Sequence, residues 1–280
     1  MGVDDLHPEV VHAVRAYLRA ADRLLPGRVV ACAIAGSIAL GAYRPGRSDV
    51  DLLVVLGGGA VRRRDMRMLR RLHRSQLPRL AGRVARGHGI SAACNASFVH
   101  ASELAHPVTT IRPIASHTGE QFAMGEAFDV NPVVWRELLD GGVVVRGAPI
   151  ATWGLDAEPD RLVEWNRANL EGYWASVRDA VARRTRPMTA AWLAWCVLGP
   201  ARLDATIVTG RILTKEQAGV LALARFDEAA GIVDVALAHV RDLPLPASPP
   251  RAEWRARAVA LMSATIASAG RPDGRDAARA

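Results

Sequence analysis

The order of apolar and polar positions divides the chain into two parts with different periods. In the first part, short apolar runs of strand length alternate with helical stretches, which is typical of an α/β or α+β domain. The expected strands lie at residues 28–35, 49–56, 90–100 and 143–146. The expected helices lie at residues 8–25, 61–80 and 133–139. We assign residues 1–150 to this domain.

The second part, from Asp160 onward, has only helical periods. Its apolar residues recur three, four or seven positions apart, which predicts amphipathic helices. The first helix is expected to bury Val163, Leu170, Trp174, Val177 and Val181, and a second contains Leu193, Val197 and Ile207. Thr214 and Gln217 have the spacing of a capping box that opens a third, and residues 252–268 form the last. We predict an all-helical bundle over residues 151–270 and a disordered tail at 271–280.

Two carboxylates stand at the start of the second strand. Asp49 and Asp51 are two residues apart, so a strand directs both side chains to one face. Like charges this close both ionise only when a cation lies between them, and oxygen ligands of this kind suit Mg²⁺ shared with phosphates. The alternative is an exposed acidic strand start.

Gly36 and Ser37 follow the first strand, about a dozen residues before these aspartates. Their backbone N–H groups and the serine hydroxyl offer donors to phosphate oxygens, and Gly36 lets a nucleotide approach the backbone. A Gly-Ser pair after one strand, followed by Asp-x-Asp at the start of the next, resembles the nucleotidyltransferase superfamily of polymerase-β type.

Three longer stretches extend the resemblance, at residues 52–56, 132–147 and 197–218. They are similar to the bacterial aminoglycoside adenylyltransferases that modify streptomycin and spectinomycin. This resemblance covers roughly residues 28–225. It implies a nucleotidyltransferase domain with a mixed sheet, a helical bundle after it, and ATP with Mg²⁺ bound between the two. It also implies a role in antibiotic resistance.

The resemblance implies a role for six residues. Asp49 and Asp51 would be the catalytic metal ligands, and Gly36 and Ser37 would contact phosphate. Arg202 and Lys215 would be the positive groups on the triphosphate. Lys215 is the one lysine of the chain, beside thirty-five arginines. Its alternative interpretation is a solvated residue in the first turn of a helix, where the helix dipole does not favour it.

The chain departs from this family at two places. The family's third carboxylate, the base for the attacking hydroxyl, aligns with Asn95, and an amide is not a useful base near pH 7. Glu103, Glu120 and Glu126 are alternative carboxylates. Acids that bind a cationic antibiotic are also replaced, by a stretch with Trp192 and Trp195, which either form bundle core or line a less charged acceptor pocket.

The distribution of positive charge bears on whether the protein binds a nucleic acid. The net charge is +8, and residues 61–80 carry eight arginines against one aspartate. We interpret this segment as a helix with Leu69 and Leu72 inward and a solvated arginine face. The alternative is an RNA- or phosphate-binding patch, which the absence of interleaved aromatic residues disfavours.

Other features point to the interior of the cell. Cys32, Cys94 and Cys196 lie among apolar residues without metal-ligand spacing and are expected to be buried and reduced. The N-terminus lacks the pattern of a secretion signal, and the longest apolar run, 29–42, is too short to span a bilayer. We therefore expect a cytoplasmic protein without membrane contact.

Three functions follow in order of preference. The first is Mg²⁺-dependent transfer of AMP from ATP to a hydroxyl of a small molecule, such as an aminoglycoside. The second is nucleotide binding with reduced or lost catalysis, because Asn95 replaces the base. The third is an RNA-directed nucleotidyltransferase guided by the arginines, although a nucleic-acid partner is not expected.

Overall fold

The computed structural model describes residues 2–85, 93–185 and 187–270. The chain divides into two compact units, Met1–Pro159 and Asp160–Ala280. The first residues of the strand expected at 90–100 and the tail expected at 271–280 lie outside the described residues. Within the described ranges, no helix combines the length and the apolar character that a membrane span requires.

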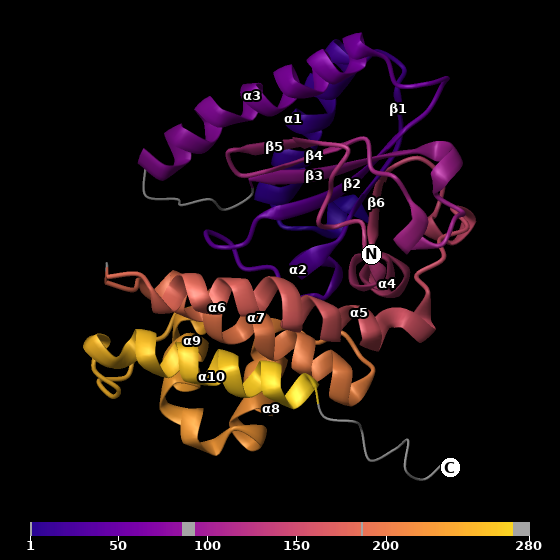
Figure 1. Ribbon diagram of the computed structural model, residues 1–280. Coiled ribbons are helices and arrows are strands. Elements are labelled where there is room, and N and C mark those ends of the chain that lie inside the picture. The colour runs from indigo at the N-terminus through magenta and orange to yellow at the C-terminus, as the bar shows by residue number, and fades with distance from the viewer. Residues whose placement is uncertain (1, 86–92, 186, 271–280) are drawn as a thin grey trace, which may run out of the picture. The chain divides into compact units, whose positions relative to one another are not determined.

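The first unit contains a mixed six-stranded sheet in the order β5-β4-β3-β2-β1-β6 (Figure 1). The strands are β1 (Val29–Ile34), β2 (Val50–Leu56), β3 (Cys94–His100), β4 (Ala115–Thr118), β5 (Gln121–Met124) and β6 (Val143–Arg146). Strands β2 and β3 are parallel, whereas every other neighbouring pair is antiparallel. The mixed sheet predicted from the resemblance is therefore confirmed. The hairpin of β4 and β5 is an addition that the sequence pattern did not predict.

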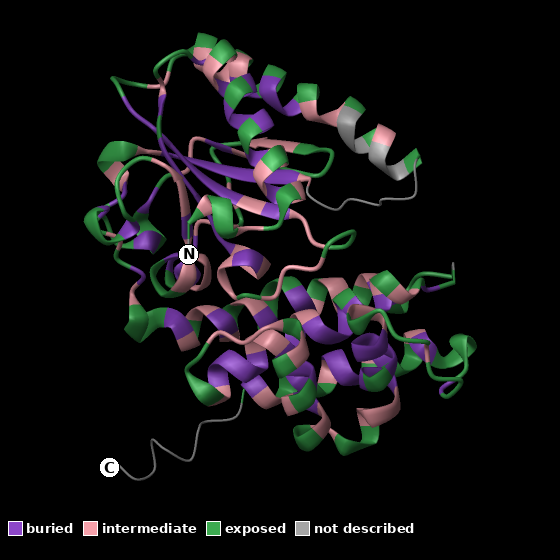
Figure 2. Ribbon diagram, turned by 180° about the vertical axis from the view of Figure 1, so that it is seen from behind, coloured by how far each residue is buried: buried purple, intermediate pink, exposed green. Residues whose placement is uncertain are grey.

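Helices cover both faces of this sheet (Figure 1). Helices α1 (Pro8–Leu24) and α3 (Arg63–Ala85) pack on the face that includes Leu52 and Val54. Helix α4 (Pro132–Gly141) packs on the opposite face, which includes Leu53 and Val55. Because strand side chains alternate between faces, the central strands are buried on both sides (Figure 2). This alternation also directs Asp51 to the face that α4 covers.

The second unit is helical, as predicted. Its helices are α5 (Leu162–Asn169), α6 (Ala175–Ala182), α7 (Ala190–Thr209), α8 (Lys215–Arg225), α9 (Ala230–Arg241) and α10 (Trp254–Ala269). A π-helical turn, Leu170–Trp174, joins α5 to α6, so the first predicted helix is continuous. Helix α7 packs against α5, α8, α9 and α10. The predicted capping box is confirmed, because Thr214 Oγ1 accepts from Gln217 N and Gln217 Oε1 accepts from Thr214 N.

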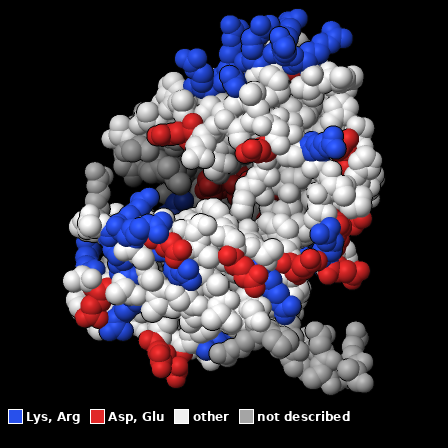
Figure 3. Space-filling view, viewed as in Figure 1, with Lys and Arg blue, Asp and Glu red and all other residues white. Residues whose placement is uncertain are grey.

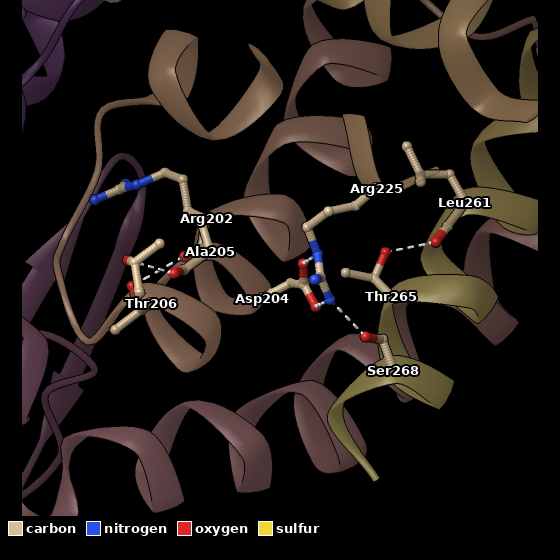
Figure 4. Close-up of polar contacts among 9 residues, drawn as sticks. Arg202, Asp204, Ala205, Thr206, Arg225, Leu261, Thr265 and Ser268 are labelled. Atoms are coloured by element: carbon tan, nitrogen blue, oxygen red, sulfur yellow. Dashed lines mark hydrogen bonds and ion pairs between the residues drawn. The ribbon is translucent and has the colours of Figure 1, made fainter. Parts of the chain in front are cut away.

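An ion pair with one buried partner links three helices of the second unit (Figure 4). Asp204 on α7 is buried and accepts hydrogen bonds from Arg225 Nε at 2.8 Å and Nη2 at 3.2 Å. Arg225 Nη2 also donates to Ser268 Oγ on α10 at 2.9 Å. Removing Arg225 would leave the buried Asp204 carboxylate without its compensating charge, so the pair favours this one packing of α7, α8 and α10.

A buried aromatic cluster lies between α1, α3 and β4. His117 Nε2 and the Tyr17 hydroxyl are 2.8 Å apart, and the His117 ring packs against the rings of His73 and Phe98. Burial, and secondarily the charge of His73, lower the pKa of His117 to about 3. The imidazole is therefore neutral in the folded protein at neutral pH.

We expect acid to destabilise the fold through His117. In the unfolded chain this histidine has a pKa near 6.5. Below that pH the unfolded state binds a proton that the folded state does not, which lowers the free energy of the unfolded state. The contribution of neutral His117 to the free energy of unfolding is fully present above pH 6.5 and is lost as the pH falls toward 3. Between pH 7 and pH 5 the wild type should lose about 2 kcal/mol more unfolding free energy than His117→Gln, measured by urea denaturation. Equal losses would show that His117 does not control this transition.

Candidate active site

The start of β2 places two carboxylates beside an amide. Asp49 directly precedes β2, Asp51 is its second residue, and Asp51 pairs with Asn95 in the parallel register of β2 and β3. Asn95 Nδ2 donates to Asp49 Oδ2 at 2.7 Å and to Asp51 Oδ1 at 3.1 Å. Asn95 Oδ1 in turn accepts from Gly119 N at 3.2 Å. The two aspartates therefore lie together, as the spacing predicts, and Asn95 bridges them as a donor.

The Gly36-Ser37 turn lies against the same carboxylates. It follows β1, whose neighbour Ala35 donates its N–H to Asp51 O at 2.9 Å. Gly36 has a φ of +64°, and a Cβ added to it would clash with Asp51 Oδ2. Ser37 Oγ is buried and has no hydrogen-bond partner among the described residues. The turn thus packs Gly36 against the Asp51 carboxylate and carries one unsatisfied hydroxyl on the next residue.

Two further carboxylates belong to this region, and the sequence reasoning missed both. Glu137 on α4 is buried, and its Oε2 accepts the Gly36 N–H at 3.1 Å. The Gly36 N–H, expected to be available to phosphate, is therefore bonded to Glu137. Asp129 lies in the segment before α4, close enough for its charge to act on Asp51. Asp51 and Glu137 thus both contact Gly36, and the charges of Asp49 and Asp129 act on Asp51.

The pKa shifts show how strongly these acids interact. Burial first, and then the charges of Asp49, Asp129 and Glu137, raise the pKa of Asp51 well above its usual value, although the Asn95 hydrogen bond opposes them. Burial, Glu137 and Asp49 raise the pKa of Asp129 to about 6. No basic side chain of the described residues is among the groups that shift either pKa. The charges that raise these two pKa values are those of other carboxylates, and a bound cation would offset them.

The donor set fits Mg²⁺ shared with a phosphate. Asp49 and Asp51 offer oxygen ligands, whereas the described residues form no group of three or more His, Cys, Asp or Glu side chains arranged around a metal. Mg²⁺ is usually held by one or two carboxylates and completes its shell with phosphates and water. The Ser37 hydroxyl, buried and without a partner among the described residues, is a donor that no protein group satisfies.

Gly36→Ala should weaken this site. The new Cβ would meet Asp51 Oδ2 and force that carboxylate to move, so we expect about tenfold weaker Mg²⁺-ATP affinity by titration calorimetry. Gly41→Ala is the matched control, because Gly41 has a φ of +65° and a Cβ added there would have nothing within 4 Å. Both variants carry the same backbone strain of about 1 kcal/mol. Equal affinities in the two variants would contradict the close packing of Gly36 on Asp51.

Arg202 and Lys215 lie in the second unit. Arg202 on α7 donates from Nε to Leu213 O at 3.1 Å, and its side chain points away from the Asp204 pair (Figure 4). Leu213 is two residues before Lys215, an exposed residue that begins α8. The structure therefore connects the Arg202 side chain to the turn that leads to Lys215.

The arginine segment forms an exposed face. Arg63, Arg67, Arg70 and Arg74 follow helical spacing along α3, and Figure 3 shows basic side chains gathered over this helix. Leu69 and Leu72 are fully buried, as expected for the inward face. The three cysteines are also buried and free, as predicted.

The tryptophans of α7 are only partly buried. Trp195 is 37% exposed and stacks on Trp174, with ring centroids 4.7 Å apart. The Arg184 guanidinium lies 4.5 Å from the centroid of the Trp192 ring. Part of each tryptophan therefore packs in the bundle, and part remains on its surface.

Comparisons with known proteins agree with this architecture. Residues 14–84, which lie within the first unit, match the family model described as a nucleotidyltransferase domain. The whole fold resembles the crystal structure of spectinomycin adenyltransferase AAD(9) from Enterococcus faecialis with ATP and spectinomycin. The TM-score is 0.56 at 12% sequence identity, over 95% of this chain and 100% of that chain. At this identity the likeness is one of fold. No curated protein matches the sequence.

Proposed function

We propose that the protein is a magnesium-dependent adenylyltransferase, which moves AMP from ATP to a hydroxyl group of a small molecule. The observation that carries this proposal is the pair of Asp49 and Asp51, bridged by Asn95, with Asp51 packed against Gly36 and the buried Glu137 bonded to the Gly36 N–H. Such a concentration of buried negative charge calls for a cation, and the nucleotidyltransferase domain around it supports a metal bound together with a nucleotide.

Each predicted residue has a distinct part in this proposal. Asp49 and Asp51 hold Mg²⁺, and the Ser37 hydroxyl donates to a phosphate oxygen of ATP. Arg202 and Lys215 bind the remaining charge of the triphosphate. Bound Mg²⁺ supplies a positive charge that stabilises the pyrophosphate leaving group. Asn95 keeps the two aspartates in place through its donated hydrogen bonds.

The acceptor is proposed from chemistry and from the fold likeness. The structure with the similar fold holds spectinomycin, which makes an aminoglycoside-type antibiotic the first acceptor to test. The partly exposed Trp192 and Trp195 favour a flat acceptor of low charge over a strongly cationic one. Modification of such a compound would make the protein an antibiotic-resistance enzyme.

Pyrophosphate release from Mg²⁺-ATP by the purified wild type tests the proposal. Streptomycin, spectinomycin and an extract of small metabolites are offered in turn, with EDTA as the control. Release that requires both an acceptor and Mg²⁺, with an acceptor that gains the mass of AMP, supports adenylyl transfer. A wild type that does not bind Mg²⁺-ATP by calorimetry would overturn it.

A second candidate function is nucleotide binding with little or no turnover. The observation that favours it is the Asn95 amide, which donates to both aspartates and therefore does not act as a base in this position. This function predicts tight binding of Mg²⁺-ATP without pyrophosphate release. It also predicts that Asn95→Glu creates or strongly raises transfer.

A further inference from the structure

The β4-β5 hairpin ends beside the candidate active site. Its turn is made by Gly119 and Glu120, which lie between the last paired residues of the two strands. Gly119 has a φ of +55°, in the left-handed region that glycine adopts readily. The Gly119 N–H donates to Asn95 Oδ1 at 3.2 Å. The turn therefore places a backbone donor against the residue that bridges the two aspartates.

This donor decides which way the Asn95 amide faces. A backbone N–H donates and cannot accept, so the atom of Asn95 that faces Gly119 N is the carbonyl oxygen. The other end of the amide, Nδ2, then donates to Asp49 Oδ2 and Asp51 Oδ1. A reversed amide would set an NH₂ group against an N–H and an oxygen against two carboxylates. Gly119 therefore keeps Asn95 in the orientation that bridges the aspartates.

Helix α3 holds the same hairpin from one side. His73 is a buried residue of α3, and its Nε2 lies 3.1 Å from Glu120 O. Because a carbonyl oxygen only accepts, Nε2 carries the proton of this bond. Arg70 contacts the hairpin on β5, where its guanidinium lies 5.7 Å from the centroid of the Phe122 ring and donates to Met124 Sδ at 3.2 Å. The Arg70 contacts are on the strand, whereas the His73 bond is at the turn itself.

We propose that His73 is a positioning residue of the active site, which acts through the Gly119-Glu120 turn and Asn95 on the two aspartates. The inference rests on the proposed binding of Mg²⁺-ATP at those aspartates. His73 Nε2 fixes the Glu120 carbonyl, and the turn that contains it carries the Gly119 N–H that orients Asn95. We call these four residues the positioning network. Outer hydrogen-bond partners of metal ligands change metal affinity by about tenfold or more when they are removed.

His73→Leu tests this inference, with Ser75→Ala as the matched control on the same helix. Leucine removes the donor to the turn but keeps an apolar side chain at a buried position, so Mg²⁺-ATP affinity by calorimetry should weaken about fivefold. His73→Gln keeps a donor of comparable reach and should stay within about twofold of the wild type. Ser75 Oγ donates to Leu72 O at 2.7 Å within α3, so Ser75→Ala removes a hydrogen bond of the helix without touching the turn. That variant should bind Mg²⁺-ATP as the wild type does.

A double-mutant cycle with Asn95→Ala separates positioning from general destabilisation. Without the amide, the turn has nothing to orient, so His73→Leu should change the Mg²⁺-ATP Kd of Asn95→Ala by less than about twofold. A His73 that only supports the fold would weaken binding by the same factor in both backgrounds. That result would overturn the positioning network and leave the proposed function intact. Failure of the wild type to bind Mg²⁺-ATP would overturn the proposed function, and the inference with it.

Two measurements on the metal-free protein test the positioning network without ATP. Amide hydrogen exchange at Gly119 should be about fivefold or more faster in His73→Leu than in the wild type, because the turn loses its anchor, and unchanged in Ser75→Ala. An unchanged rate at Gly119 in His73→Leu would overturn the inference. Nitrogen NMR of the wild type should show a proton on His73 Nε2, and an unprotonated Nε2 would exclude the bond to Glu120 O and the positioning network with it.

Discussion

Asp49→Asn should lower AMP transfer by about a thousandfold or more while making the metal-free protein more stable. The amide keeps the size of the carboxylate but removes the charge that holds Mg²⁺, and electrostatic groups of this kind contribute several kcal/mol to a phosphoryl transition state. The same change removes a negative charge that raises the pKa of buried Asp51, so the folded state loses a repulsion.

Two measurements on the same protein check this prediction. Pyrophosphate release reports catalysis, and thermal unfolding in EDTA reports stability. Asp140→Asn is the matched control, because Asp140 is an exposed residue of α4 that pairs with Arg136 at 2.8 Å. That variant should leave both quantities near the wild type. Wild-type transfer by Asp49→Asn would exclude Asp49 as a metal ligand, whereas lost activity with lost stability would indicate misfolding.

The predictable elements of the fold are those with a clear hydrophobic pattern. The strands around the Gly-Ser and Asp-x-Asp motifs are apolar runs next to glycines, and they lie within one or two residues of their predicted bounds. The β4-β5 hairpin was missed because each strand has four residues and shows little alternation. Helix α9 was not separated from α8, since the break at Asp227–Ala229 has neither glycine nor proline.

The candidate site was predictable only where its residues are close in sequence. Asp49 and Asp51 lie on one strand, and the register of β2 and β3 brings Asn95 to them. Asp129 and Glu137 come from a connecting segment and a helix about eighty residues further along the chain. One signal for Glu137 is present, because it lies three residues after Val134 on the face of α4 that packs on the sheet. A carboxylate at an apolar helical position indicates a buried partner.

The structure also changes the meaning of Asn95. From the sequence, Asn95 is a missing base, because an amide has replaced a carboxylate. In the structure its Nδ2 group donates to both Asp49 and Asp51, which makes it a neutral donor between two like charges. The same residue therefore stabilises the metal-free site through the hydrogen bonds that it donates.

Asn95→Asp should make the stability of the fold depend on Mg²⁺. Aspartate at this position removes both donated hydrogen bonds and adds a third charge beside Asp49 and Asp51, in a buried environment. An uncompensated buried charge costs about 3–5 kcal/mol, so we expect a loss of this size in EDTA. Saturating Mg²⁺ should restore most of it, because the ion neutralises the added carboxylate and binds only to the folded state.

The comparison with Asn95→Ala separates charge from hydrogen bonding in this variant. Alanine removes the same two donated bonds without adding a charge, so its loss of stability should be similar in EDTA and in Mg²⁺. Unfolding by urea at matched pH, with and without Mg²⁺, measures both variants. A Mg²⁺-dependent recovery of Asn95→Asp alone would locate the cation at these carboxylates independently of any acceptor. Equal behaviour of the two variants would mean that no cation binds beside Asn95, and the metal assignment of Asp49 and Asp51 would then fail.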